Sequence, residues 1–302
     1  MAVTTEKRVF ENEKRVRPKK SGRARAWELD ALRGLSILMV VWDHFMYSVG
    51  HIFYLDGWEY SDSSFLNAFG EFALDYWHST LRLYGWPVFV FIFFFVSGIC
   101  TAFSRNNFLR GIKLAAVALA VSGITYLIDK VIGFSGVFIL FGVLHCLAFC
   151  ILLFFFLSLL TSLLNKVKGS NYIKGAVYLL TAIALYIINH FFNVDLIDLQ
   201  LHGATMPDTT PVTGLFVFTD DWWTADYFPL LPFFAFFMTG AAIAQFFYPN
   251  GKSLLPSLDG KWNRFLTIPG KYSLYIYLGI QVVAVIVLWL LTIAVTGETY
   301  FI

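Results

Sequence analysis

Apolar residues run through most of this chain in stretches of about 20, separated by short polar turns and two longer polar connections. An α-helix needs about 20 residues to cross a bilayer, so each stretch is long enough to span it. We therefore predict an all-α fold, a polytopic transmembrane helix bundle of about seven spans. The predicted spans are residues 29–50, 86–103, 111–128, 137–162, 175–193, 227–247 and 272–296.

The two longer connections differ in pattern. Between 51 and 85, apolar residues recur at helical spacing from Phe65 to Tyr76, which predicts an amphipathic helix at the membrane interface. The connection 194–226 contains no Lys or Arg and is rich in Asp, Thr, Pro and Trp. A connection of that length in a compact protein is usually functional or disordered.

Composition agrees with the pattern. Hydrophobic residues make up 58% of the chain and charged residues only 14%, whereas a soluble domain averages about 25% charged residues. No apolar run precedes the first predicted span, so we expect that span to be its own insertion signal rather than a cleaved signal peptide.

Basic residues are distributed unevenly along the chain. Residues 1–26 form a basic tail, which we interpret as a cytoplasmic segment near anionic lipid rather than a nucleic-acid binder, and residues 27–302 form the membrane domain. If the N-terminus is cytoplasmic, only Arg82 and Lys130 of the 22 Lys and Arg residues fall on the far side. This asymmetry predicts a cytoplasmic N-terminus and an odd number of spans.

The first span carries ionisable residues where hydrocarbon is expected. Asp43 and His44 lie deep in it, and an Asp inside a span costs about 2.5–3.5 kcal/mol on insertion scales, so a functional role is the default interpretation. Arg33 and His44 share one helical stripe and are separated by roughly 16 Å along the helix axis. We expect both side chains to face one cavity.

His145, near the outer end of the fourth span, is predicted to lie at a similar depth to His44. Asp43, His44 and His145 are therefore the candidate catalytic residues, because a carboxylate near an imidazole orients it and raises its basicity. Two alternatives stay open. His145 could be a buried histidine that hydrogen-bonds neighbouring helices. Asp43 points roughly 100° away from His44 on a helix and could serve a helix contact.

Candidate binding residues occur at both predicted membrane faces. Arg33, Arg105 and Arg110 suit phosphate groups at the cytoplasmic mouth, and Gly34 allows close approach; the alternative is ordinary positive-inside charge. On the outer side, Trp222, Trp223 and Asp226 place aromatic faces beside a carboxylate, an arrangement that suits sugar recognition. The alternative there is a belt of interfacial tryptophans.

Other kinds of site receive little support. All three cysteines, Cys100, Cys146 and Cys150, lie in apolar spans. We interpret Cys146 and Cys150 as packing residues. No pair of His or acidic residues has metal-ligand spacing within a span, so no metal site is expected. Neither a glycine-rich phosphate loop nor a GxSxG motif is present.

Five blocks of sequence, in this order, resemble the catalytic-domain family of heparan-alpha-glucosaminide N-acetyltransferase and its bacterial members. They are ELDALRGLSILMVVWDHF, FVSGICTAFSRNNFLRGIKL, FGVLH, DYFPLLPFFAFFMTG and GKYSLYIYLGIQ. The first block also resembles the membrane acyltransferase type 3 family, in which an Arg-Gly and a His have the separation of Arg33 and His44. The resemblance covers roughly residues 27–285.

The resemblance implies a multi-pass enzyme of the cell membrane that uses cytoplasmic acetyl-CoA to acetylate a sugar on the far side. His44 would be the catalytic base and Arg33 would lie near the coenzyme. Two features depart from the family. Gln281 stands in a block that often reads His-Gln-Pro, and the first outer loop aligns poorly, so His51 or His78 could supply the histidine of that loop.

Three functions are therefore carried forward from the sequence. The first is acetyl transfer to an amine or hydroxyl of an extracytoplasmic sugar or glycan. The second is transport or flipping of a lipid-linked or anionic sugar, because the stripe from Arg33 to His44 could line its pathway. The third is that of a structural membrane subunit. The expected partners are membrane lipid, acetyl-CoA and the sugar acceptor, and the sequence leaves open whether the chain forms a homodimer.

Overall fold

A computed structural model describes residues 26–55, 57–132, 137–166, 169–191, 212–216, 225–249 and 251–297. Nearly all of these residues are helical, and the described part of the chain contains no β-strand. The α-helices are α1 (Trp27–Tyr47), α2 (Ser64–Trp77), α3 (Thr80–Ile99), α4 (Asn107–Leu127), α5 (Val143–Ser162), α6 (Ser170–Phe191), α8 (Leu230–Phe247), α9 (Arg264–Lys271) and α10 (Ser273–Thr296).

Seven helical segments are long and apolar enough to cross a membrane, which confirms the predicted number of spans. They are Trp27–Tyr54, Thr80–Phe103, Asn107–Val131, Val143–Ser162, Ser170–Phe191, Leu230–Phe247 and Ser273–Thr296. The first is α1 continued by a π-helical segment, Ser48–Tyr54. The amphipathic helix expected in the first connection is α2. Which side of the membrane holds the N-terminus stays a prediction.

The starts of two predicted spans were wrong by six residues, each for a local reason. The second span begins at Thr80 rather than 86, because the Ser79 hydroxyl caps the helix and Pro87 is tolerated inside it. The fourth span begins at Val143 rather than 137, because Asp226 accepts a hydrogen bond from the backbone N–H of Val143 and fixes the helix start there.

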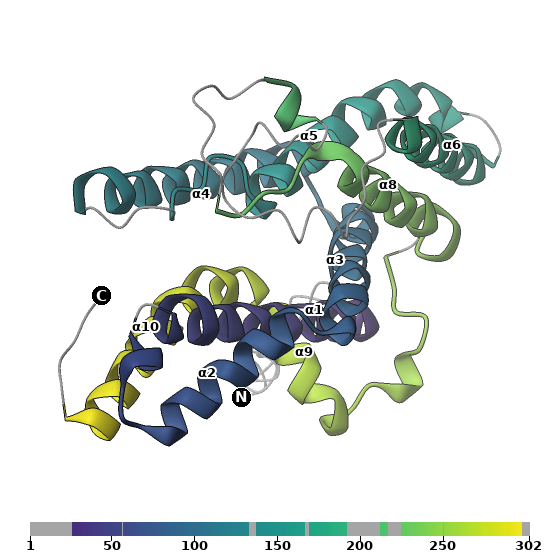
Figure 1. Ribbon diagram of the computed structural model, residues 1–302. Coiled ribbons are helices and arrows are strands. Elements are labelled where there is room, and N and C mark those ends of the chain that lie inside the picture. The colour runs from purple at the N-terminus through teal and green to yellow at the C-terminus, as the bar shows by residue number, and fades with distance from the viewer. Residues whose placement is uncertain are drawn as a thin grey trace, which may run out of the picture.

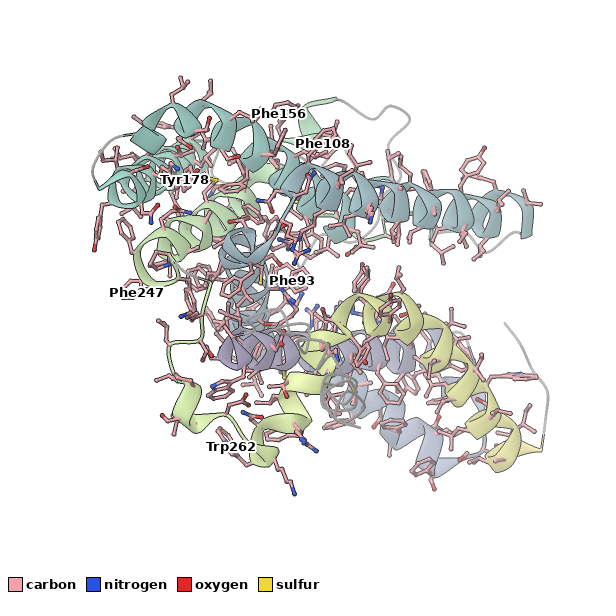
Figure 2. All side chains as sticks on the ribbon, turned by 180° about the vertical axis from the view of Figure 1, so that it is seen from behind. Phe93, Phe108, Phe156, Tyr178, Phe247 and Trp262 are labelled. Carbon is pink, nitrogen blue, oxygen red and sulfur yellow. The ribbon has the colours of Figure 1, made fainter. Side chains whose placement is uncertain are left out.

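The helices form two layers joined by α3. Figure 1 shows α4, α5, α6 and α8 on one side and α1, α2, α9 and α10 on the other, with α3 running between them. In Figure 2, Tyr178 points into the first layer, whereas Phe156 and Phe247 lie on its outside. Their exposed fractions are 2%, 55% and 57%. Large exposed aromatic side chains on a spanning helix are expected where the helix faces lipid.

A close helix contact places α9 against the start of α1. A methyl group at Gly34 would overlap the carbonyl oxygen of Leu266, and one at Gly270 would overlap the carbonyl oxygen of Asp30. Small residues permit this kind of backbone contact between membrane helices. The start of α1, which carries Arg33, is therefore held on α9.

Candidate active site

His44 lies half-buried near the end of α1, with its ring orientation fixed from within the helix. Its Nδ1 atom is 3.0 Å from the carbonyl oxygen of Val40. A carbonyl can only accept, so Nδ1 carries the proton, and Nε2 of the neutral ring holds an unshared electron pair. No hydrogen bond to Nε2 occurs among the described residues. The ring is thus set up to accept a proton at Nε2.

The ring of His44 contacts a polar chain that reaches three other segments. It meets the ring of Tyr277 on α10 edge to face, with centroids 6.2 Å apart. The Tyr277 hydroxyl donates to Oδ2 of Asp226 at 2.7 Å. The same oxygen accepts from the backbone N–H of Val143 at 3.0 Å. Asp226 therefore joins the end of the connection 194–226 to the N-terminus of α5 and to α10.

His145 uses both of its ring nitrogens. Nδ1 accepts from the backbone N–H of Gly142 at 3.2 Å, and Nε2 lies 3.0 Å from the hydroxyl of Ser122 on α4. Because Nδ1 accepts, the proton of a neutral ring is on Nε2 and is donated to Ser122. This geometry matches the alternative of a histidine that connects helices, and it leaves no nitrogen free to accept a proton.

A small cavity lies beside these groups. Its lining includes His145, Asp226, Tyr277 and Gly142, and its volume is about 10 Å³, which is roughly the space that one water molecule needs. A second, open groove lies between α6 and α8. Neither space reaches Arg33, so a passage from Arg33 to His44 stays a prediction.

Asp43 is bound to a residue that the sequence analysis did not select. Nε and Nη2 of Arg82 donate to its two carboxylate oxygens at 2.7 and 3.3 Å. The hydroxyl of Tyr76 donates to Oδ1 at 3.2 Å. Burial and the neighbouring carboxylate raise the pKa of Tyr76 above its usual value. The hydrogen bonds of Asp43 thus run to α2 and α3, away from His44, as its 100° offset allows.

At the other end of the α1 stripe, Arg33 and Arg110 approach one another. Nη2 of Arg33 donates to the Cys100 sulfur at 2.9 Å. Arg110, on α4, lies close enough to interact electrostatically with both Arg33 and Cys100. Neither arginine forms a salt bridge with a carboxylate in the described part of the chain. Two cations near one another without an acidic partner favour an anionic ligand.

The structure gives less support to a binding role for the remaining predicted residues. Arg105 is exposed. Gly34 packs against α9, which by itself accounts for a glycine at that position. Trp222 and Trp223 lie outside the described residues. Gln281, where the family often has a histidine block, donates from Nε2 to the hydroxyl of Ser48 at 3.1 Å and so ties α10 to the end of α1.

Four residues of this arrangement were missed. Tyr277, Ser122 and Cys100 carry no pattern that distinguishes them from other residues in apolar spans. Arg82 could have been found, because it is the one Arg or Lys between 51 and 85 and Asp43 is the one acidic residue deep in the first span. Opposite charges inside an apolar phase are expected to pair.

A comparison with protein-family models decides the family. The model of the catalytic domain of heparan-alpha-glucosaminide N-acetyltransferase matches residues 25–282, most of the chain. The chain belongs to this family. It is a multi-pass membrane protein of an acetyltransferase family, as the resemblance predicted. No curated protein and no solved structure gives a significant match to the chain.

Proposed function

We propose that this family member transfers an acetyl group from cytoplasmic acetyl-CoA to an amine or hydroxyl of a sugar or glycan on the far side of the cell membrane. The observation that carries the proposal is the state of His44, whose Nδ1 is held by Val40 while Nε2 has an unshared pair. A base within the membrane domain of an acetyltransferase family has a direct use, which is to deprotonate the acceptor.

The chemistry follows from that base. Nε2 of His44 removes the proton of the acceptor N–H or O–H as the acceptor atom attacks the thioester carbonyl. The new bond to carbon forms and the bond from carbon to sulfur breaks. The imidazolium then returns the proton to the departing sulfur, so that acetylated acceptor and free CoA leave. A site of low water content limits hydrolysis of the thioester.

Arg33 and Arg110 are the residues proposed to hold the donor. Guanidinium groups bind phosphate oxygens through paired N–H donors, and these two lack a carboxylate partner among the described residues. Arg105, two residues before the start of α4, adds positive charge to the mouth. Gly34 keeps α1 close to α9 and so fixes the position of Arg33.

On the acceptor side, the proposal assigns positioning roles to His145 and Asp226. His145 caps the start of α5, and Asp226 holds that start against Tyr277, whose ring contacts His44. Trp222 and Trp223 lie four and three residues before Asp226 in the sequence, and we assign them to packing on the sugar ring. Asp43 is assigned to positioning, since its carboxylate is bound to Arg82.

Purified protein in detergent, incubated with acetyl-CoA carrying a labelled acetyl group and with glucosamine-type acceptors, tests the proposal. We expect release of CoA that depends on the acceptor, together with a labelled acceptor product. If none of the acceptors tried causes release of CoA, that result would contradict acetyl transfer. Labelled sugar that crosses a proteoliposome membrane without acetylation would instead support the transporter.

A further inference from the structure

Among the described residues, Arg82 is the most buried basic side chain whose role the proposed reaction does not explain. Its side chain is 4% exposed, and its guanidinium is bound on two sides. Along one edge it donates to both oxygens of Asp43. Its flat face lies on the ring of Trp77, with 3.4 Å from Cζ to the ring centroid. A planar guanidinium can make both contacts at once, whereas a lysine ammonium cannot.

The two partners of Arg82 are next to histidines in the sequence. Asp43 precedes His44 on α1, and Trp77 precedes His78 at the end of α2. Trp77 also contacts the rings of Tyr47 and His51, which follow His44 by one and two turns on the same helical segment. Arg82 itself lies in the first turn of α3, where the Ser79 hydroxyl accepts from its backbone N–H. One guanidinium thus joins α1, α2 and α3 on the outer side of His44.

We propose that Arg82 is a positioning residue for acetyl transfer: it holds His44 in a fixed position relative to the turn between α2 and α3. The inference rests on the proposed function of His44. Arg82 does not touch the reacting atoms. It acts through Asp43, and because this pair is buried, loss of either member leaves a charge without its partner inside the membrane domain.

Three substitutions separate this role from others. Arg82→Gln removes the cation, Arg82→Lys keeps the charge but not the planar fork, and the double variant Asp43→Asn with Arg82→Gln removes both charges. Lys130→Gln is the control: Lys130 forms an ion pair with Asp129 at 2.9 Å, but its own side chain is 49% exposed, and buried Asp129 keeps the hydrogen bond that it accepts from the backbone N–H of Phe138. Folded protein is quantified for each variant by size exclusion and thermal unfolding.

We expect Arg82→Gln to lower kcat per folded enzyme at least tenfold while the KM for acetyl-CoA changes less than twofold, since Arg33 and Arg110 lie at the other end of α1. The double variant should recover part of the loss because Asp43 is no longer left charged. Arg82→Lys should lie between wild type and Arg82→Gln, and Lys130→Gln should match wild type. A kcat of Arg82→Gln within twofold of wild type would overturn the inference.

Hydrogen exchange separates this inference from the proposed function. In Arg82→Gln, amides of residues 43–51 and 74–82 should exchange at least tenfold faster, and those of 264–271 should not change. If the wild-type protein transfers acetyl to no acceptor, the proposed function is contradicted. The exchange pattern would still test whether Arg82 connects α1 to the turn between α2 and α3. Unchanged exchange in 43–51 would overturn the positioning role by itself.

Discussion

Nδ1 of His44 lies 3.0 Å from the carbonyl oxygen of Val40, one turn earlier on the same helix. This bond makes Nε2 the nitrogen that accepts a proton and prevents the ring from turning freely. The base is therefore positioned by the backbone of its own helix, while a second helix, through Tyr277, packs against the ring.

Replacement of His44 by Gln should lower kcat by about 10²- to 10⁴-fold, the usual contribution of a general base. The amide keeps a hydrogen-bonding group of similar size but cannot accept a proton at neutral pH. The KM for acetyl-CoA should change little. His190→Gln, on α6, is the control and should behave as wild type in the labelled-acetyl assay. Equal losses in the two variants would contradict the assignment of the base.

Arg33→Gln and Arg110→Gln should each raise the KM for acetyl-CoA by about tenfold or more, because a charge-assisted hydrogen bond contributes about 1.5–3 kcal/mol. The measurement is initial rate against acetyl-CoA concentration at two salt concentrations. Lys261→Gln removes one charge from the same predicted membrane face and should leave the KM unchanged. A uniform effect of all three variants would indicate general positive-inside charge rather than a donor site.

Gly34→Ala should lower the free energy of unfolding by about 1–3 kcal/mol, the usual cost of overpacking. The added methyl group would overlap the carbonyl oxygen of Leu266 and push α1 from α9. Gly123→Ala adds the same group where no atom lies within 4 Å and serves as the control. Thermal unfolding in detergent measures both. Equal transition temperatures for the two variants would show that α1 and α9 do not pack this closely.

Tyr76 gives a prediction in pH, because burial and Asp43 raise its pKa above the usual value, which is about 10. The folded state then holds the phenol proton that the unfolded state loses above about pH 10, so stability from this group is constant below pH 10 and falls above it. Thermal unfolding of wild type and Tyr76→Phe from pH 7 to 11 should show a difference that narrows only above about pH 10. A stability difference between the two proteins that already narrows between pH 7 and 9 would contradict a raised pKa of Tyr76.

The sequence predicted the architecture well because bilayer thickness dictates the length of each apolar stretch. The seven apolar helices of the structure correspond in order to the seven predicted stretches. The ends of spans were harder to predict. The start of α5 depends on Asp226, which is 83 residues away in the sequence, and no local pattern reports a contact of that separation.

The geometry of the candidate site was predictable from the sequence only in part. A stripe at helical spacing placed Arg33 and His44 on one helix, since that spacing is a local property. Partners across helices were not predictable from it: Asp43 was grouped with His44 but binds Arg82, and Tyr277 reaches His44 from the last span. The packing of α1, α3 and α10 decides those contacts, and single-chain periodicity does not encode it.

The most direct test of the central claim uses proteoliposomes in which the N-terminus faces outward. Labelled acetyl-CoA is supplied outside only, and a sugar amine acceptor is sealed inside only. Wild-type protein should produce acetylated sugar inside while CoA appears outside, and His44→Gln should produce neither. Product that forms only when donor and acceptor share one compartment would contradict transfer across the membrane through His44.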